Sequence, residues 1–180
     1  MSIGRSDSQL RAAPVMIRTS MSDWFWSYGF ADVRENVLIG AFPLDAGDVK
    51  MIADLGVREI LNLAEDEEYP PGRREEVIAA LAAAQIPETR IRFVDHGALP
   101  PEQLEQAVQT VVGWLQSGRR SYVHCRAGWQ RSAAIAAGVI AVNDALEIEE
   151  ALEIVRSRKP SAVPLEHQHH DLVRWWRERA

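Results

Sequence analysis

The chain of 180 residues contains a single cysteine, Cys125. One cysteine cannot form an internal disulfide, and this favours a reducing compartment, so we predict a cytoplasmic protein. The thiol remains available for metal binding or for nucleophilic chemistry. The alternative is an inert cysteine buried in the core, which is common for free thiols.

Lysine and long apolar runs are also scarce. Only two lysines are present, and the formal net charge is −6, which excludes the positive footprint of a nucleic-acid-binding protein. No stretch has the length of a membrane-spanning helix, so we expect no integral membrane segment. An anionic substrate would therefore need a local positive site. The hydrophobic fraction of 47% fits one globular domain.

The first residues differ from the rest of the chain. Residues 1–22 show no sustained hydrophobic period and are predicted to form a disordered tail. The aromatic run "DWFW" at 23–26 is typical of packed structure, so we place the domain at residues 23–180.

Predicted strands and helices alternate through this domain. The hydrophobic patterns and the Gly and Pro boundaries predict strands at 36–43, 57–65, 89–95 and 121–125, and helices at 46–56, 73–85, 100–118, 130–142, 147–158 and 165–178. This alternation predicts an α/β fold with a central, mainly parallel sheet flanked by helices.

The cysteine lies between the predicted strand at 121–125 and the next helix, in the string "YVHCRAGWQRS". At such a junction the backbone N–H groups form a concave anion site, and the helix N-terminus adds positive charge. Gly128 allows close backbone approach, and the guanidinium of Arg131 matches two phosphate oxygens. We expect these groups to lower the pKa of Cys125. The predicted phosphate-binding residues are Arg126, Ala127, Gly128, Trp129, Gln130 and Arg131.

The string "HCRAGWQRS" resembles the His-Cys-x5-Arg-Ser/Thr signature of the cysteine-based protein tyrosine phosphatase superfamily, with the spacing of its dual-specificity branch. The resemblance covers most of 23–180 and includes "LIGAFP", "LGVREILNL" and "VDHGALP". It implies a dual-specificity-phosphatase-like fold and a phosphocysteine intermediate, without metal or cofactor. In this resemblance Cys125 attacks phosphorus, Arg131 binds the phosphoryl oxygens, Ser132 stabilises the thiolate, and His124 supports the loop from behind.

A phosphatase of this type needs an acid that protonates the leaving oxygen. Asp95 ends the predicted strand at 89–95 and precedes "HGALPP", which we interpret as a movable flap. The carboxyl ends of parallel strands meet at one sheet edge, so Asp95 is expected near Cys125, and the resemblance implies the same residue. The alternatives are that Asp95 only caps a turn, or that His96 is the donor; we expect the side chain of His96 to point elsewhere.

Two further segments each have two interpretations. The histidines of "EHQHHD", which are His167, His169 and His170, either bind a metal or form a solvated helix surface, and the sequence favours the surface. The acidic run "AEDEEY" (64–69) is typical of a solvated loop, although it also resembles a segment of the mitochondrial-type phosphatidylglycerophosphate phosphatases.

The sequence therefore predicts a dual-specificity-type phosphatase acting on a phosphoprotein, with a phospholipid as the alternative substrate. Trp129, and Arg126 as the only variable basic residue of the loop, disfavour a highly phosphorylated inositol head group. Two rivals remain at this point: an inactive phosphate-binding module, and a rhodanese-like sulfurtransferase, whose active loop has a different length.

Overall fold

The computed structural model of the protein describes residues 21–179. Most of the predicted disordered tail, residues 1–20, lies outside this part. Ser22, which we had assigned to the tail, is held in place, because its N–H and hydroxyl donate to Asp48 at 2.8 and 2.7 Å. Its hydroxyl also accepts from Phe25 and caps the first helix.

One five-stranded sheet forms the centre of the molecule, and the prediction of a mainly parallel sheet is confirmed. Its order is β1-β2-β5-β3-β4, and β1 alone runs antiparallel to its neighbour. The strands are β1 (Phe30–Arg34), β2 (Val37–Ala41), β3 (Glu59–Asn62), β4 (Glu88–Arg90) and β5 (Ser121–Cys125). The pattern analysis missed β1 because this edge strand buries only Val33 and carries charges on either side of it.

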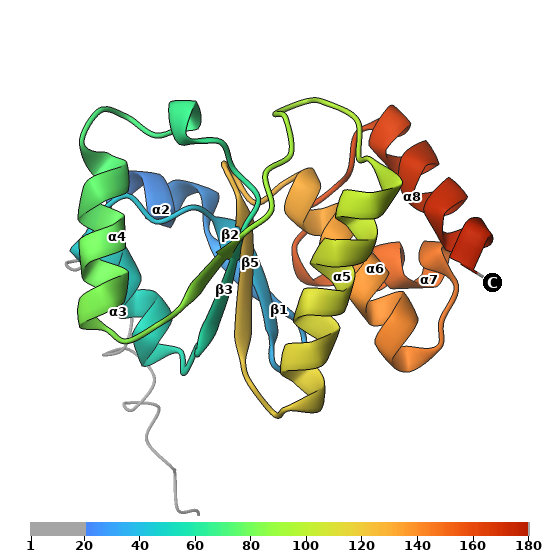
Figure 1. Cartoon of the computed structure of the whole chain (residues 1–180), viewed down its shortest axis with the longest axis horizontal. Coiled ribbons are helices and arrows are strands. Elements are labelled where there is room, and N and C mark those ends of the chain that lie inside the picture. Colours follow the sequence, from blue (N-terminus) through green and yellow to red (C-terminus); the bar gives the residue numbers. More distant parts are fainter. Residues whose placement is uncertain (1–20, 180) are drawn as a thin grey trace, which may run out of the picture.

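Helices cover both faces of the sheet, as Figure 1 shows: α2, α3 and α4 lie on one side, and α5 to α8 lie on the other. The helices are α2 (Asp23–Tyr28), α3 (Ala46–Asp54), α4 (Arg73–Ala83), α5 (Pro101–Gln116), α6 (Arg131–Asp144), α7 (Ile148–Arg158) and α8 (Glu166–Arg179), with a short 3₁₀ helix η1 (Asp66–Glu68). The six helices predicted from periodicity are all present with ends shifted by a few residues.

The three central strands, β2, β5 and β3, are buried along their whole length because helices cover them on both faces. Helix α6 is buried from its first residue to Ala141, enclosed by the sheet, α5, α7 and α8. Its alanines allow this close packing, and a side chain at Gly138 would approach Val108 of α5 to 2.7 Å. The helix N-terminus is thereby fixed next to the carboxyl end of β5.

The predicted strand at 89–95 is shorter than expected. Strand β4 ends at Arg90, and Asp95 lies in a turn beyond it, not at a strand end. The chain nevertheless continues beside β3, since Ile91 N–H donates to Asn62 and Phe93 N–H donates to Leu63. Asp95 therefore still reaches the edge of the sheet where β5 ends.

Candidate active site

The loop at residues 126–130 joins β5 to α6 and packs tightly on β2. Gly128 has a φ of +72°, and a Cβ there would lie 2.3 Å from the carbonyl carbon of Gly40. Both its backbone conformation and this contact therefore require glycine. Arg126 accepts a hydrogen bond from Phe42 N–H at 3.0 Å, which fixes the start of the loop to the chain after β2.

Cys125 lies at the base of this loop with only 3% of its surface exposed. Its Sγ is 3.4 Å from the hydroxyl of Ser132, the second residue of α6. Burial by itself would raise the pKa of the thiol. The charge of Arg131, the hydroxyl and N–H of Ser132 and the N–H of Gly128 outweigh it, and the pKa of Cys125 is lowered. The site thus stabilises a thiolate.

Arg131 is the central cation of the site and is 1% exposed. Its Nη1 and Nη2 donate to the two carboxylate oxygens of Glu68, each at 2.7 Å, and Nη1 also donates to Phe93 O at 2.8 Å. Asp95 Oδ1 lies 2.9 Å from Nη2. Burial opposes the charge, but these acceptors and the nearby thiolate raise the pKa of Arg131, so the guanidinium stays charged.

Glu68 is a site residue that the sequence analysis missed. The run at 64–69 is not the solvated loop that we expected, because the Glu68 side chain is 8% exposed and Tyr69 is 6% exposed. Tyr69 packs on Phe42 with ring centroids 4.2 Å apart and accepts a hydrogen bond from Asn62. The sequence signals were a tyrosine at the end of an acidic run and the resemblance of this run to a segment of the phosphatidylglycerophosphate phosphatases.

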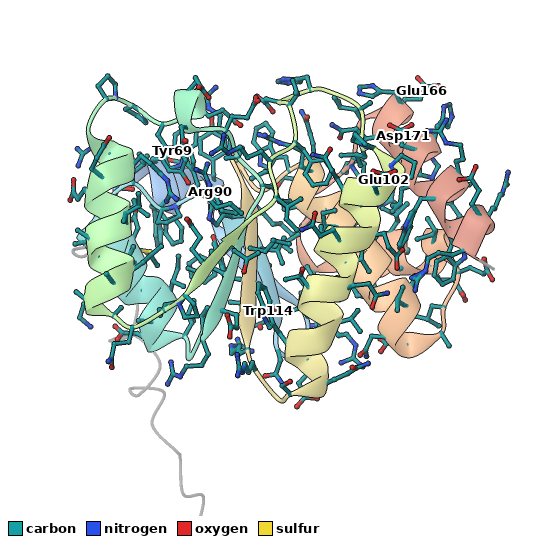
Figure 2. The ribbon with its side chains drawn as sticks, in the orientation of Figure 1. Tyr69, Arg90, Glu102, Trp114, Glu166 and Asp171 are labelled. Carbon is teal, nitrogen blue, oxygen red and sulfur yellow. The ribbon has the colours of Figure 1, made fainter. Side chains whose placement is uncertain are left out.

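Local contacts orient Glu68 toward Arg131. Its Oε1 also accepts from Glu65 N–H at 2.8 Å, which closes the η1 turn. Arg90 fixes the same turn from below, since it donates to Asp66 at 2.7 Å and to the carbonyl of Ala64. Figure 2 shows Tyr69 and Arg90 close to η1, above the end of the sheet.

Asp95 and His96 both reach the site. Asp95 is 27% exposed, and its Oδ2 lies 3.3 Å from His96 Nδ1. His96, which has a φ of +58°, lines the same cavity as Cys125, so the expectation that its side chain points elsewhere was wrong. The reversed backbone at His96 turns the chain back toward the sheet and brings both side chains to the site.

The loop at residues 94–100, called the acid loop because it carries Asp95, is hydrogen-bonded to α8. Gln168 Nε2 donates to Gly97 O at 3.0 Å, and His167 Nε2 lies 3.1 Å from the same oxygen. Leu99 N–H donates to Asp171 at 2.9 Å. Figure 2 labels Asp171 on α8 beside this loop. The backbone of the loop that carries Asp95 is therefore held by α8.

His124 lies behind the loop, fully buried, where the resemblance had placed it. Burial lowers its pKa to about 4, so the ring is neutral near pH 7. Its Nδ1 is 3.3 Å from Cys125 O. The neighbouring strands enclose it on both sides, since it pairs with Gly40 of β2 and Asn62 of β3.

The site opens into a cavity of about 180 Å³. Cys125, Arg131, Asp95 and the loop side chains face it, together with residues of α2 that the sequence analysis did not connect with the site. The described residues around it are Trp24, Tyr28, Asp95, His96, Cys125, Arg126, Ala127, Trp129, Gln130 and Arg131. The arrangement places a thiolate, a fixed cation and a carboxyl group around one small space.

The histidines of α8 do not gather into a metal centre within residues 21–179, where no group of three His, Cys, Asp or Glu side chains could hold an ion. His169 instead lies 2.8 Å from Glu149 of α7. In the same part of the chain, none of the helices has the length and apolar character needed to cross a bilayer.

The sequence matches the family model "Dual specificity phosphatase, catalytic domain" over residues 41–178. The chain belongs to this family. It therefore contains the catalytic domain of a cysteine-dependent phosphatase, and the predicted superfamily and branch are confirmed. The rhodanese-like alternative is excluded by the same match.

Characterised relatives come from two groups. The phosphatase is 28% identical over 134 residues to "Phosphatidylglycerophosphatase and protein-tyrosine phosphatase 1" of Mus musculus, a match that covers 74% of this chain and 66% of that protein. It is 26% identical over 131 residues to "Dual specificity protein phosphatase 12" of Mus musculus, covering 73% of this chain and 36% of that protein. The chain thus spans less than two thirds of the length of these relatives.

Solved structures share the fold. PTPMT1 in complex with PI(5)P superposes with a TM-score of 0.72 at 24% identity, covering 83% of this chain and 95% of that one. Tk-PTP in its active form gives a TM-score of 0.72 at 20% identity, covering 83% and 97%. At these identities the likeness concerns the fold.

Proposed function

We propose that the phosphatase works through a phosphocysteine intermediate. The observation that carries this is Cys125, a thiol of lowered pKa at the base of a cavity whose fixed cation is Arg131. The Cys125 thiolate attacks phosphorus, and a new S–P bond replaces the P–O bond of the ester. The leaving oxygen takes a proton from the carboxyl group of Asp95.

The second half of the reaction uses the same groups. The Asp95 carboxylate accepts a proton from water, the resulting hydroxide attacks phosphorus, and the S–P bond breaks to release inorganic phosphate and the thiolate. Arg131 and the N–H groups of loop 126–130 bind the phosphoryl oxygens in both steps. Because Asp95 pairs with Arg131 at 2.9 Å, a bound phosphoryl group would replace it there and leave its carboxyl group beside the leaving oxygen.

We further propose a phosphoprotein as substrate and a reducing, cytoplasmic setting, which keeps the thiol free. A phospholipid is the second candidate, because the name of the mouse relative includes both phosphatidylglycerophosphatase and protein-tyrosine phosphatase. Hydrolysis of phosphopeptides should be compared with that of phosphatidylglycerophosphate in vesicles. A higher kcat/KM for the vesicles would replace the protein assignment by the lipid one.

Rapid acid quench after mixing with a ³²P-labelled phosphotyrosine peptide tests the intermediate. We expect acid-stable label on the wild-type protein and none on Cys125→Ser, which should still bind inorganic phosphate because Arg131 and the loop remain. Turnover by Cys125→Ser near the wild-type rate would contradict the nucleophile assignment. A wild-type protein that binds phosphate without turnover would instead be the inactive binding module.

A further inference from the structure

One side of the catalytic cavity is an aromatic wall formed by Trp24, Tyr28 and Trp129. The ring centroids of Trp24 and Tyr28 are 4.2 Å apart, and those of Tyr28 and Trp129 are 5.2 Å apart. Trp129 belongs to the loop beside Cys125, whereas the other two rings come from α2. Helix α2 precedes residue 41, where the match to the family model begins, so two of the three rings lie outside the matched range.

Two buried charged side chains hold α2 in this position, and neither belongs to the catalytic machinery. Asp48 of α3 is fully buried and accepts from the N–H and hydroxyl of Ser22, the residue that caps α2. Lys159, which is 7% exposed, donates from Nζ to Tyr28 O at 2.7 Å. A buried charge is unfavourable unless it is well bonded, so these contacts fix both ends of the helix.

We propose that the aromatic wall selects the leaving group and makes the enzyme favour aryl phosphates, such as the phosphotyrosine side chain of a peptide, over alkyl phosphates. This rests on the proposed phosphatase reaction and adds its substrate class. Trp24, Tyr28 and Trp129 are specificity-determining residues, and Asp48 and Lys159 are positioning residues that act through α2.

The size and surface of the cavity support an aryl group. A volume of about 180 Å³ is below the several hundred Å³ typical of sites for larger ligands, so a phosphoryl group and one ring suit it better than a large head group. Aromatic faces attract another ring in tilted or offset contact at the centroid spacings already seen within the wall. An alkyl phosphate of serine would leave these faces uncovered.

The charges at the mouth are consistent with a substrate of low charge. Arg126 is the only lysine or arginine besides Arg131 among the described residues that line the cavity, and its guanidinium lies 5.8 Å from the Trp24 ring. This cation–π contact places the charge against the wall. A substrate with several phosphates would meet ring faces, which carry negative potential, on that side.

Binding of phosphonates isolates the wall from catalysis, because these compounds have no leaving group. We expect wild type to bind phenylphosphonate more tightly than methylphosphonate. Trp129→Leu and Tyr28→Leu should each reduce this preference roughly two- to tenfold, and Tyr28→Leu, which lies outside the phosphate-binding loop, should leave the Kd of methylphosphonate unchanged. Trp129 is 41% exposed, so its replacement spares the core. Trp26→Leu is the matched control on α2, since Trp26 is 48% exposed and does not line the cavity.

The same variants are then assayed with two peptides that differ only in phosphotyrosine or phosphoserine. The ratio of their kcat/KM values should fall roughly two- to tenfold in each wall variant and stay constant in Trp26→Leu. Lys159→Met should lower the ratio as Tyr28→Leu does, and the double variant should lose no more than either single one, because both act through the same ring.

Two results would overturn the selection of aryl phosphates by the wall: equal binding of the two phosphonates by wild type, or a Trp129→Leu variant with an unchanged preference. Additive losses in Lys159→Met with Tyr28→Leu would overturn the role of Lys159 as a positioning residue. In the last case the wall would stand without its positioning residue. If wild type hydrolyses no phosphomonoester but still prefers phenylphosphonate, the proposed function fails and the wall remains as a binding element.

Discussion

Replacing Glu68 by glutamine tests whether this buried carboxylate orients Arg131. The two residues share two hydrogen bonds of 2.7 Å, with 1% and 8% of their side chains exposed. Glutamine keeps the shape and one acceptor, but its amide N–H₂ faces guanidinium N–H groups, so one contact becomes a meeting of two donors. The substitution therefore removes orientation and charge while leaving the volume unchanged.

The expected losses follow from this geometry. Removing one partner of a buried ion pair costs about 3–5 kcal/mol, and the lower end applies because Arg131 retains Phe93 O and Asp95. We expect the free energy of unfolding to fall by about 3 kcal/mol. A guanidinium that is no longer fixed loses part of its transition-state contact, so kcat should fall on the order of 10²-fold.

The pH dependence separates orientation from mere destabilisation. The positive charge of Arg131 lowers the pKa of Cys125. A negative charge at Glu68 opposes that effect, because a nearby like charge disfavours the thiolate. Removing the carboxylate therefore lowers the pKa of Cys125 further. The acidic limb of kcat/KM, which follows thiolate formation, should move to lower pH even though the rate at its plateau is reduced.

The assay is kcat/KM for a phosphotyrosine peptide from pH 4.5 to 8, together with urea unfolding. Glu67→Gln is the matched control, because Glu67 neighbours Glu68 in η1 and is exposed. It should change neither the rate nor the acidic limb. A Glu68→Gln enzyme within twofold of wild type, or an acidic limb that moves to higher pH, would refute the reasoning.

Four other substitutions or conditions have defined outcomes. Asp95→Asn should slow an alkyl phosphate far more than an activated aryl phosphate, whose phenolate leaves unaided; equal losses would make Asp95 structural and His96 the next donor to test. Arg131→Lys should reduce kcat/KM severely, since one ammonium cannot replace a planar fork held by two carboxylates; a small change would contradict the assigned role. Gly128→Ala should abolish activity while Gly72→Ala, also at positive φ but with open space around it, should not; equal effects would contradict the contact with β2. Burial lowers the pKa of His124 from 6.5 to about 4, so the unfolded chain binds a proton at a higher pH than the folded protein does. The free energy of unfolding should therefore fall by about 3 kcal/mol as the pH falls from 6.5 to 4. A flat pH profile in urea unfolding, or the same profile in His124→Asn, would contradict this.

Most of the site residues that could be predicted are contiguous in sequence. Cys125, Gly128 and Arg131 lie within one strand–loop–helix unit, so their spacing alone determines which groups converge. The parallel sheet brings the carboxyl ends of β4, β3 and β5 to one edge, and Asp95 was expected there although the predicted strand before it was too long. The loop needed only a local pattern, whereas Asp95 also needed the predicted parallel sheet.

The residues that were missed reach the loop only through tertiary packing. Glu68 belongs to an acidic run without hydrophobic period, and its burial depends on Tyr69 packing against Phe42 and on Arg90 holding η1. Trp24 was expected to pack on the domain, but nothing in "DWFW" indicates which surface of the domain Trp24 contacts. That surface is determined by the contact of Ser22 with Asp48, across 26 residues of chain.

The segment "EHQHHD" has a structural role that its local sequence pattern does not indicate. Its histidines form no metal centre among the described residues, and it is more than a solvated face, because Gln168 is fully buried and bonded to Gly97 O. Asp171 holds Leu99 N–H from the next turn of α8. These are backbone groups of the acid loop, which has no strand partner there and would otherwise leave polar groups unpaired. The C-terminal helix therefore takes the place of a sheet neighbour for the acid loop, and the position of Asp95 depends on residues more than 70 positions away.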